Sequence, residues 1–119
     1  VFMPETNARF LKPELFPERP GLAAIDVSFI SLRLILGPVF SVMAPGGEVI
    51  ALIKPQFELA PGDLKRGIVK TEELRQKAVE NMRAFIKSAL PEAEEKGLVD
   101  SPIKGAKGNL EFLWLLKKK

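Results

Sequence analysis

The amino-acid sequence predicts one α/β domain in which helices cover both faces of a sheet. Two apolar runs, Leu22–Val27 and Glu48–Ile53, have the continuous hydrophobicity of strands that are buried on both sides, as in parallel sheets. Apolar residues recur at helical spacing between these runs and again after the second one. The chain then closes with two strand-like segments that the stretch KGAKG would join as a hairpin. This order of elements is typical of an α/β sheet.

The first half of the chain is expected to hold one strand end, a proline-rich connection and a strand–helix–strand unit. Val1–Met3 is predicted to be the strand end. A helix is expected over residues 32–43, capped by Ser28 or Ser31. Pro38 should kink that helix or mark a second start.

The second half is expected to hold a loop, one long helix and the hairpin. The loop covers residues 55–67 and is rich in Gly and Pro. Thr71, followed by two glutamates, is a good helix start, because carboxylates suit the positive end of a helix. The helix is predicted to persist to about Lys96, with Gly97 as its stop. The two closing strands are expected at Leu98–Ile103 and Asn109–Leu116.

The composition excludes several kinds of site. None of the 119 residues is cysteine or histidine. There can be no disulfide and no thiolate metal site, and any general base must be lysine, a carboxylate or an activated hydroxyl. The net charge of +3 is compatible with a polyanionic partner but too small to require nucleic acid, and three of the positive charges, Lys117–Lys119, could be only a solvated tail. The longest apolar-leaning stretch, residues 30–45, is interrupted by a proline and an arginine and is too short to span a bilayer.

Charged residues stand at the predicted carboxyl ends of the strands, where α/β sheets carry their working groups. Asp26 lies in the first buried run and Lys54 directly follows the second. The two could form a structural salt bridge, or Asp26 could orient Lys54 to take or steer a proton from a substrate hydroxyl. Glu111, near the start of the last strand, is a third candidate, although it could simply be an outward-facing strand residue.

Other candidates have simpler explanations beside the functional ones. Lys65 and Arg66 in the loop could contact phosphate, as RNA-binding residues, or could belong to a solvated charged loop. Phe29 and Leu32 in DVSFISL could be plain core, and Ser28 a helix cap. The segment KGAKG joins two strands and opens no helix, so it is not a phosphate-binding loop.

Four motifs in this order resemble a known family: TNAR at 6–9, DVSFISL at 26–32, IKPQFE at 53–58 and SPIKGAKGNLEFL at 101–113. They are similar to the hemolysin/TlyA family of FtsJ-like (RrmJ-like) ribose 2′-O-methyltransferases, over essentially the whole chain. The resemblance implies a Rossmann-like sheet, S-adenosylmethionine as cofactor, ribosomal RNA or a ribosomal subunit as partner, and a cytoplasmic location. A non-catalytic RNA-binding module and a hemolysin-type membrane activity remain as alternatives.

The resemblance also implies roles for individual residues. The last three members of the family's Lys-Asp-Lys-Glu catalytic set correspond to Asp26, Lys54 and Glu111, with Asn7 and Asp26 near the cofactor and no metal. The first lysine, the glycine-rich cofactor loop and an S4-type RNA-binding domain are expected upstream of Val1. Residues 1–119 would then be the C-terminal part of the methyltransferase domain, inactive alone, with an unpaired sheet edge that could mediate a homodimer.

Overall fold

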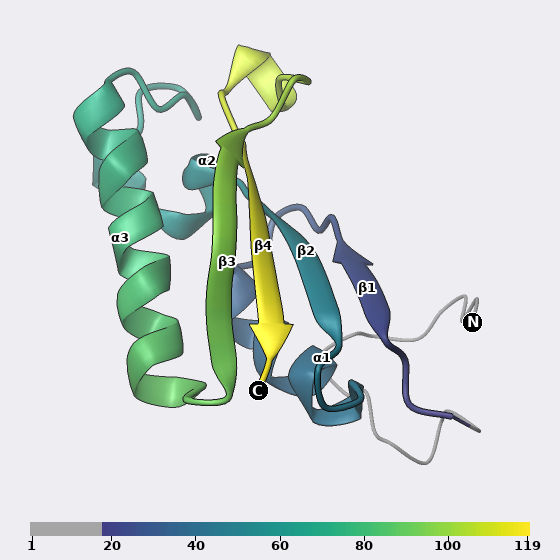
Figure 1. Cartoon of the computed structure of the whole chain (residues 1–119). Helices are drawn as coiled ribbons and strands as arrows, with labels where there is room; N and C mark the ends of the chain where they lie inside the picture. The colour runs from purple at the N-terminus through teal and green to yellow at the C-terminus, as the bar shows by residue number, and fades with distance from the viewer. Residues whose placement is uncertain (1–17) are drawn as a thin grey trace.

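The computed structural model describes residues 18–119, which form a four-stranded mixed sheet packed against helices (Figure 1). The strands are β1 (Leu22–Ile25), β2 (Glu48–Ile53), β3 (Ala93–Asp100) and β4 (Phe112–Lys118). They lie in the order β1-β2-β4-β3, with β1 and β2 parallel and β4 antiparallel to both of its neighbours. The chain therefore ends in the predicted β-hairpin. The strand end expected at Val1–Met3 lies outside the described residues.

The helical segments include short helices in the stretches that were predicted to be loops, residues 55–67 and 104–108. The segments are η3 (Leu32–Leu34), α1 (Leu36–Val42), α2 (Pro55–Glu58), η4 (Pro61–Asp63), α3 (Glu72–Ala89) and η5 (Ala106–Gly108). The helix expected over 32–43 is divided into η3 and α1, and Pro38 lies in the first turn of α1, where its missing N–H is tolerated. Pro38 thus marks a second start. Ser31 caps η3, since its Oγ accepts a hydrogen bond from the Arg33 N–H at 3.0 Å.

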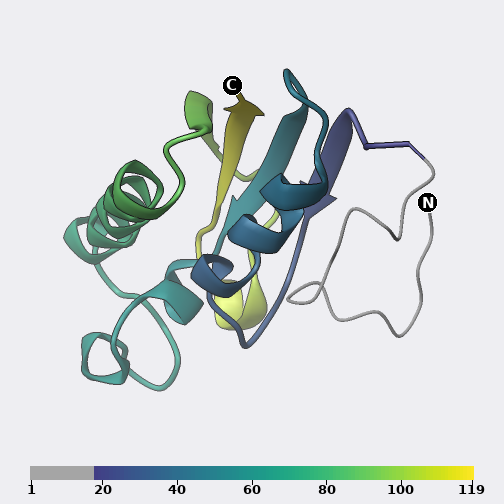
Figure 2. The ribbon, with the colours of Figure 1, turned by 90° about the horizontal axis from the view of Figure 1, so that it is seen from below.

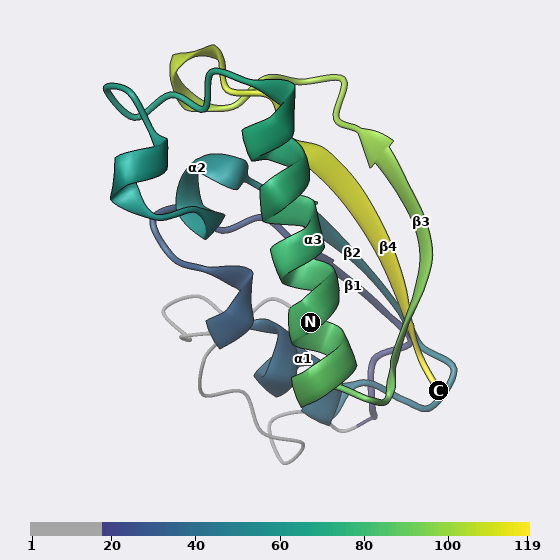
Figure 3. The ribbon, with the colours of Figure 1, turned by 90° about the vertical axis from the view of Figure 1, so that its left-hand side faces the viewer.

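Helices α1 and α3 lie on the same face of the sheet (Figures 2 and 3). The residues of β2 that face them, Val49, Ala51 and Ile53, are fully buried. The residues between them point to the opposite face, where Ile50 is 39% exposed. Within residues 18–119, therefore, the expectation of helices on both faces is not met. The alternation matters for function, because Lys54 continues the series of the uncovered face.

Helix α3 ends at Ala89, and the prediction that it persists to Lys96 is wrong. Pro91 disfavours helical backbone at the preceding residue, so the chain leaves the helix there. Ala93–Asp100 then pairs with β4, which overrides the helical tendency of its charged residues. Arg83 of α3 donates two hydrogen bonds of 2.9 Å to the carboxylate of Glu95 and so links α3 to β3. The hairpin strands are accordingly shifted from their predicted positions.

The terminal lysines are not only a solvated tail. Lys117 and Lys118 belong to β4, and the Lys118 ammonium donates to the carbonyl oxygens of Phe40 at 2.7 Å and Met43 at 3.0 Å. These carbonyls lie at the C-terminal end of α1, where a positive charge is favoured. Lys118 thereby joins the last strand to α1.

Of the helices in residues 18–119, none combines the length and the apolar character that crossing a membrane requires.

Candidate active site

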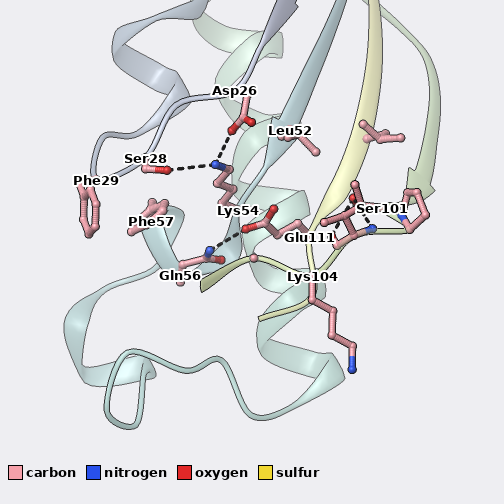
Figure 4. Close-up of a pocket in the computed structure, with 14 residues that line it drawn as sticks. Asp26, Ser28, Phe29, Leu52, Lys54, Gln56, Phe57, Ser101, Lys104 and Glu111 are labelled. Carbon is pink, nitrogen blue, oxygen red and sulfur yellow. Dashed lines mark hydrogen bonds and ion pairs between the residues drawn. The ribbon is translucent and has the colours of Figure 1, made fainter. Parts of the chain in front are cut away.

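Asp26 and Lys54 meet where the parallel strands β1 and β2 end (Figure 4). Asp26 directly follows β1 and Lys54 directly follows β2, and parallel neighbours end at the same edge of a sheet. The Lys54 ammonium lies 2.5 Å from Oδ1 of Asp26 and 3.1 Å from Oγ of Ser28. With two of its three protons directed at these acceptors, the ammonium can offer the third to a bound molecule.

Lys54 reaches this place because the chain turns immediately after it. Pro55 occupies the first position of α2, so the strand cannot continue and Lys54 becomes the residue before the helix. Its side chain is only 11% exposed, whereas that of Asp26 is 68% exposed. The lysine is therefore a largely desolvated cation held from the solvent side by a carboxylate. This arrangement fixes the position of the charge and leaves little freedom to its stem.

Glu111 lies opposite Lys54, because β2 and β4 pair in antiparallel register up to Ile53 and Phe112. Its carboxylate is buried and accepts a 2.8 Å hydrogen bond from Nε2 of Gln56. Among the described residues Lys54 forms its ion pair with Asp26. Glu111 contacts the amide of Gln56 instead of the lysine. Gln56 was not among the candidate site residues, although it lies within the motif IKPQFE, because its segment was expected to be a loop.

Gly105 allows the connection between β3 and β4 to close over Glu111. A Cβ atom at position 105 would lie 1.8 Å from Oε2 of Glu111, closer than side-chain atoms can approach, and at a tight 3.1 Å from Nε2 of Gln56. The connection is held in place by a 2.8 Å backbone hydrogen bond from Gly105 to Asn109. Only a glycine fits here without displacing the carboxylate.

These side chains line one pocket of about 470 Å³, a size typical of sites for small ligands (Figure 4). The structure thus brings Asp26, Lys54 and Glu111 together in a single pocket, at the carboxyl ends of β1 and β2. Leu52 and Leu113 contribute apolar surface from the uncovered face of the sheet. The arrangement can hold a polar group against a fixed ammonium within a partly apolar wall.

Phe29 stands at the rim of the pocket and is 89% exposed, so the expectation that it is core is wrong. Leu32, by contrast, is core. Phe29 has a φ of 63°, a rare conformation for a bulky side chain, and its ring lies 5.1 Å from that of Phe57 at an interplanar angle of 52°. An exposed aromatic ring held in this way offers a flat surface to a planar ligand.

Glu58 anchors the loop that carries Ser28 and Phe29. Its carboxylate accepts a 2.6 Å hydrogen bond from the hydroxyl of Ser31 and a 2.8 Å bond from the backbone N–H of Leu32. Burial raises the pKa of Glu58 above its usual range, and the hydrogen bonds from Ser31 and Leu32 offset part of that rise. The segment that follows β1 is therefore joined to α2 by the buried carboxyl group of Glu58. The contacts of Lys54 with Asp26 and Ser28 join the same two parts of the chain.

Replacing Glu58 should change the pH dependence of stability in a defined direction. Because the folded-state pKa is raised, the folded chain binds more protons than the unfolded chain just above the unfolded pKa. The free energy of unfolding should therefore fall as pH rises through the interval between these two pKa values. Glu58→Gln should remove that fall, whereas Glu58→Ala should cost about 1–3 kcal/mol by leaving the Leu32 N–H unpaired.

Urea denaturation at several pH values, read against Glu73→Gln on the exposed face of α3, measures both effects. A difference between wild type and Glu58→Gln that stays constant from acidic to neutral pH would contradict this assignment.

The remaining candidate residues lie elsewhere. Lys65 and Arg66 are exposed in the loop before α3 and do not line the pocket. Asn7 and the TNAR motif lie outside the described residues.

Comparison with known proteins agrees with this geometry. The FtsJ-like methyltransferase family model matches residues 1–118. The candidate rRNA methyltransferase YqxC of Bacillus subtilis is 44% identical over 115 residues, which are 95% of this chain and 40% of that protein. The 16S/23S rRNA (cytidine-2′-O)-methyltransferase TlyA of Mycobacterium tuberculosis is 34% identical over 117 residues, which are 97% of this chain and 43% of that protein. A solved structure of a candidate hemolysin from Lactococcus lactis has a TM-score of 0.93 and 41% identity, covering 100% of this chain and 57% of its own.

The chain therefore spans less than half the length of these two curated relatives. The match over nearly all residues confirms both the resemblance to the TlyA and hemolysin group and the prediction of a Rossmann-like α/β fold. The chain belongs to the FtsJ-like methyltransferase family.

Proposed function

We propose that the full-length protein transfers a methyl group from S-adenosylmethionine to a ribose 2′-hydroxyl of ribosomal RNA. The observation that carries the proposal is the Lys54 ammonium, held among the described residues by Asp26 and Ser28, inside a pocket at the carboxyl ends of parallel strands. Such a cation would stabilise the oxygen of a hydroxyl that loses its proton while it attacks an electrophile, and the same nitrogen could take that proton only as the neutral amine. A ribosomal RNA substrate would also place the reaction in the cytoplasm.

The residues of the pocket fit the proposed cofactor. S-adenosylmethionine supplies an electrophilic methyl group on a positively charged sulfur. The exposed carboxylate of Asp26 would lie near that charge, and the pocket of about 470 Å³ has room beside it. Asn7 is proposed as a further contact of the cofactor.

The side chains of this chain would then act on the ribose hydroxyl. Lys54 would take the hydroxyl proton at Nζ if it is the neutral amine, or steer the hydroxyl by donating to its oxygen if it is the ammonium, while Asp26 keeps the nitrogen in place. Glu111 would act through Gln56, which follows Lys54 by two residues, so its proposed effect on the lysine geometry is indirect. Holding the hydroxyl oxygen in line with the methyl group supplies much of the rate by positioning. Phe29 would receive the base of the target nucleotide, since base–aromatic stacking accepts any base.

We further propose that residues 1–119 form the C-terminal part of the methyltransferase domain and that the chain alone is inactive. The support is the coverage of the curated relatives, of which it matches 40% and 43%. The outer edge of β1, which in residues 18–119 pairs on one side with β2, would receive a strand of the full-length protein. In the isolated chain that edge could pair with a second copy instead.

The proposal is tested by incubating full-length protein and the 119-residue chain with labelled S-adenosylmethionine and ribosomal RNA. We expect label in RNA only with the full-length protein. The labelled site should resist alkaline cleavage, because the free 2′-hydroxyl is the nucleophile of that cleavage. Label at a position that alkali still cleaves would contradict ribose methylation.

A further inference from the structure

Two loops that are far apart in the sequence carry positive charge without acidic residues. Residues 64–71 contain three basic side chains and residues 101–110 contain two, and neither segment contains aspartate or glutamate. All five side chains are exposed: Lys65, Arg66, Lys70, Lys104 and Lys107. The two segments are called the basic loops below.

The basic loops are tied together beside the pocket. The Lys107 ammonium donates to the backbone oxygen of Arg66 at 2.8 Å. The buried side chain of Asn109 donates to the Gly67 oxygen at 2.9 Å and accepts from the Val69 N–H at 2.9 Å. Both loops lie at the same end of the molecule (Figure 3). Their spacing is therefore set by hydrogen bonds between the backbones and side chains of the two segments.

The charges of the basic loops are not neutralised within residues 18–119. Elsewhere the chain pairs its basic side chains with acids, as in Arg83 with Glu95 and Lys96 with Glu94. No ion pair of the described residues involves a basic loop, and Asp63, the acid nearest in sequence to Lys65, is taken by Lys77 at 3.1 Å. Like charges brought together repel one another, so this arrangement is favourable chiefly when a polyanion lies across it.

The basic loops also connect with the pocket. Lys104 lines the pocket, and its neighbour Gly105 packs over Glu111. From Lys104 the charged surface continues to Lys107, whose ammonium contacts the backbone of Arg66. Basic residues therefore begin at the pocket wall, with Lys104, and continue along the connection to the contact of Lys107 with the other basic loop.

We propose that the basic loops form a phosphate-binding track for the single-stranded RNA segment that flanks the target nucleotide. The inference rests on the proposed function and adds to it the path of the substrate: Lys104 beside the target nucleotide, with Lys107, Arg66 and Lys65 at successive phosphates. A single strand is required, because the target ribose must enter a pocket while its neighbours follow the surface.

The test measures binding of a single-stranded RNA oligonucleotide to full-length protein over a range of salt concentrations. The triple variant Lys65→Gln, Arg66→Gln, Lys104→Gln should lower the slope of log affinity against log salt by about 2, since each phosphate contact on a single strand contributes roughly 0.7. The matched control removes three positive charges away from the loops, at Lys87, Lys117 and Lys119, and should leave the slope nearly unchanged. All six side chains lie at the surface or partly exposed, so both variants are expected to fold.

The outcomes separate this inference from the proposed function. Equal losses of slope in the two triple variants would overturn the track and indicate a general effect of net charge. An equal loss for an RNA duplex of the same length would overturn the assignment to a single strand. RNA binding with the expected slope in a protein that transfers no methyl group would leave the track standing and remove the proposed reaction.

Discussion

Replacing Lys54 by methionine in the full-length protein is expected to lower the rate of methyl transfer by about a hundred- to ten-thousand-fold, the range over which a positioned proton-transfer group contributes. Methionine keeps an unbranched stem in the space between β2 and α2 but removes the ammonium that contacts Asp26 and Ser28. Asp26 is 68% exposed, so the carboxylate left behind is solvated and stability should change little. The loss should therefore appear in kcat and not in the unfolding midpoint.

The Lys54 experiment needs a variant that separates proton transfer from charge. Lys54→Arg keeps a positive charge beside Asp26, but a guanidinium does not release its proton at neutral pH. If Lys54 takes the hydroxyl proton, the arginine variant should be as slow as the methionine variant. If Lys54 only steers the hydroxyl, the arginine variant should recover a substantial part of the rate.

Lys87→Met, at an exposed lysine of α3 outside the pocket and the basic loops, is the control for the removal of one positive charge. Undiminished turnover by Lys54→Met under conditions where Lys87→Met is also active would remove Lys54 from the mechanism.

The meeting of Asp26 and Lys54 could be predicted from sequence because it follows from strand order alone. Each residue stands at or beside the end of an apolar run, and parallel neighbours deliver their ends to one edge. The prediction that Lys54 faces the site follows equally from alternation along β2 and from the turn forced by Pro55. Local rules were sufficient here because the backbone itself places these groups.

The contacts of Glu111 and Phe29 could not be predicted in the same way, because they depend on how loops pack. Glu111 binds Gln56, 55 residues away, only because the connection before β4 folds back over it. Phe29 is exposed because Ser28 and Ser31, on either side of it, are bound to Lys54 and Glu58. The hydrophobic pattern of the sequence does not predict side-chain contacts of this kind between loops. The end of α3 differs, because Pro91 marks it in the sequence, and only the strand that follows depended on pairing with β4.

Gly105→Ala should be the most damaging single-methyl addition at the site. The new Cβ would lie 2.5 Å from Cδ of Glu111 and 1.8 Å from its Oε2, so the buried carboxylate must leave its place. Forcing an atom into a filled site costs about 1–3 kcal/mol, and the broken Gln56–Glu111 hydrogen bond adds to this. We expect a total loss of about 2–4 kcal/mol in the free energy of unfolding, measured by urea denaturation. Gly62→Ala is the matched control, because no atom lies within 4 Å of its Cβ position.

A double-mutant cycle identifies the cause of the Gly105→Ala loss. In a Glu111→Ala background the carboxylate is gone, so adding the methyl group at position 105 should cost less than about 1 kcal/mol. If the cost in that background equals the cost in wild type, the methyl group acts on the backbone of the connection and not on Glu111. If the two costs differ as expected, the coupling energy reports how firmly the fold holds the carboxylate. In that case Glu111 and Gln56 keep their positions because Gly105 has no side chain.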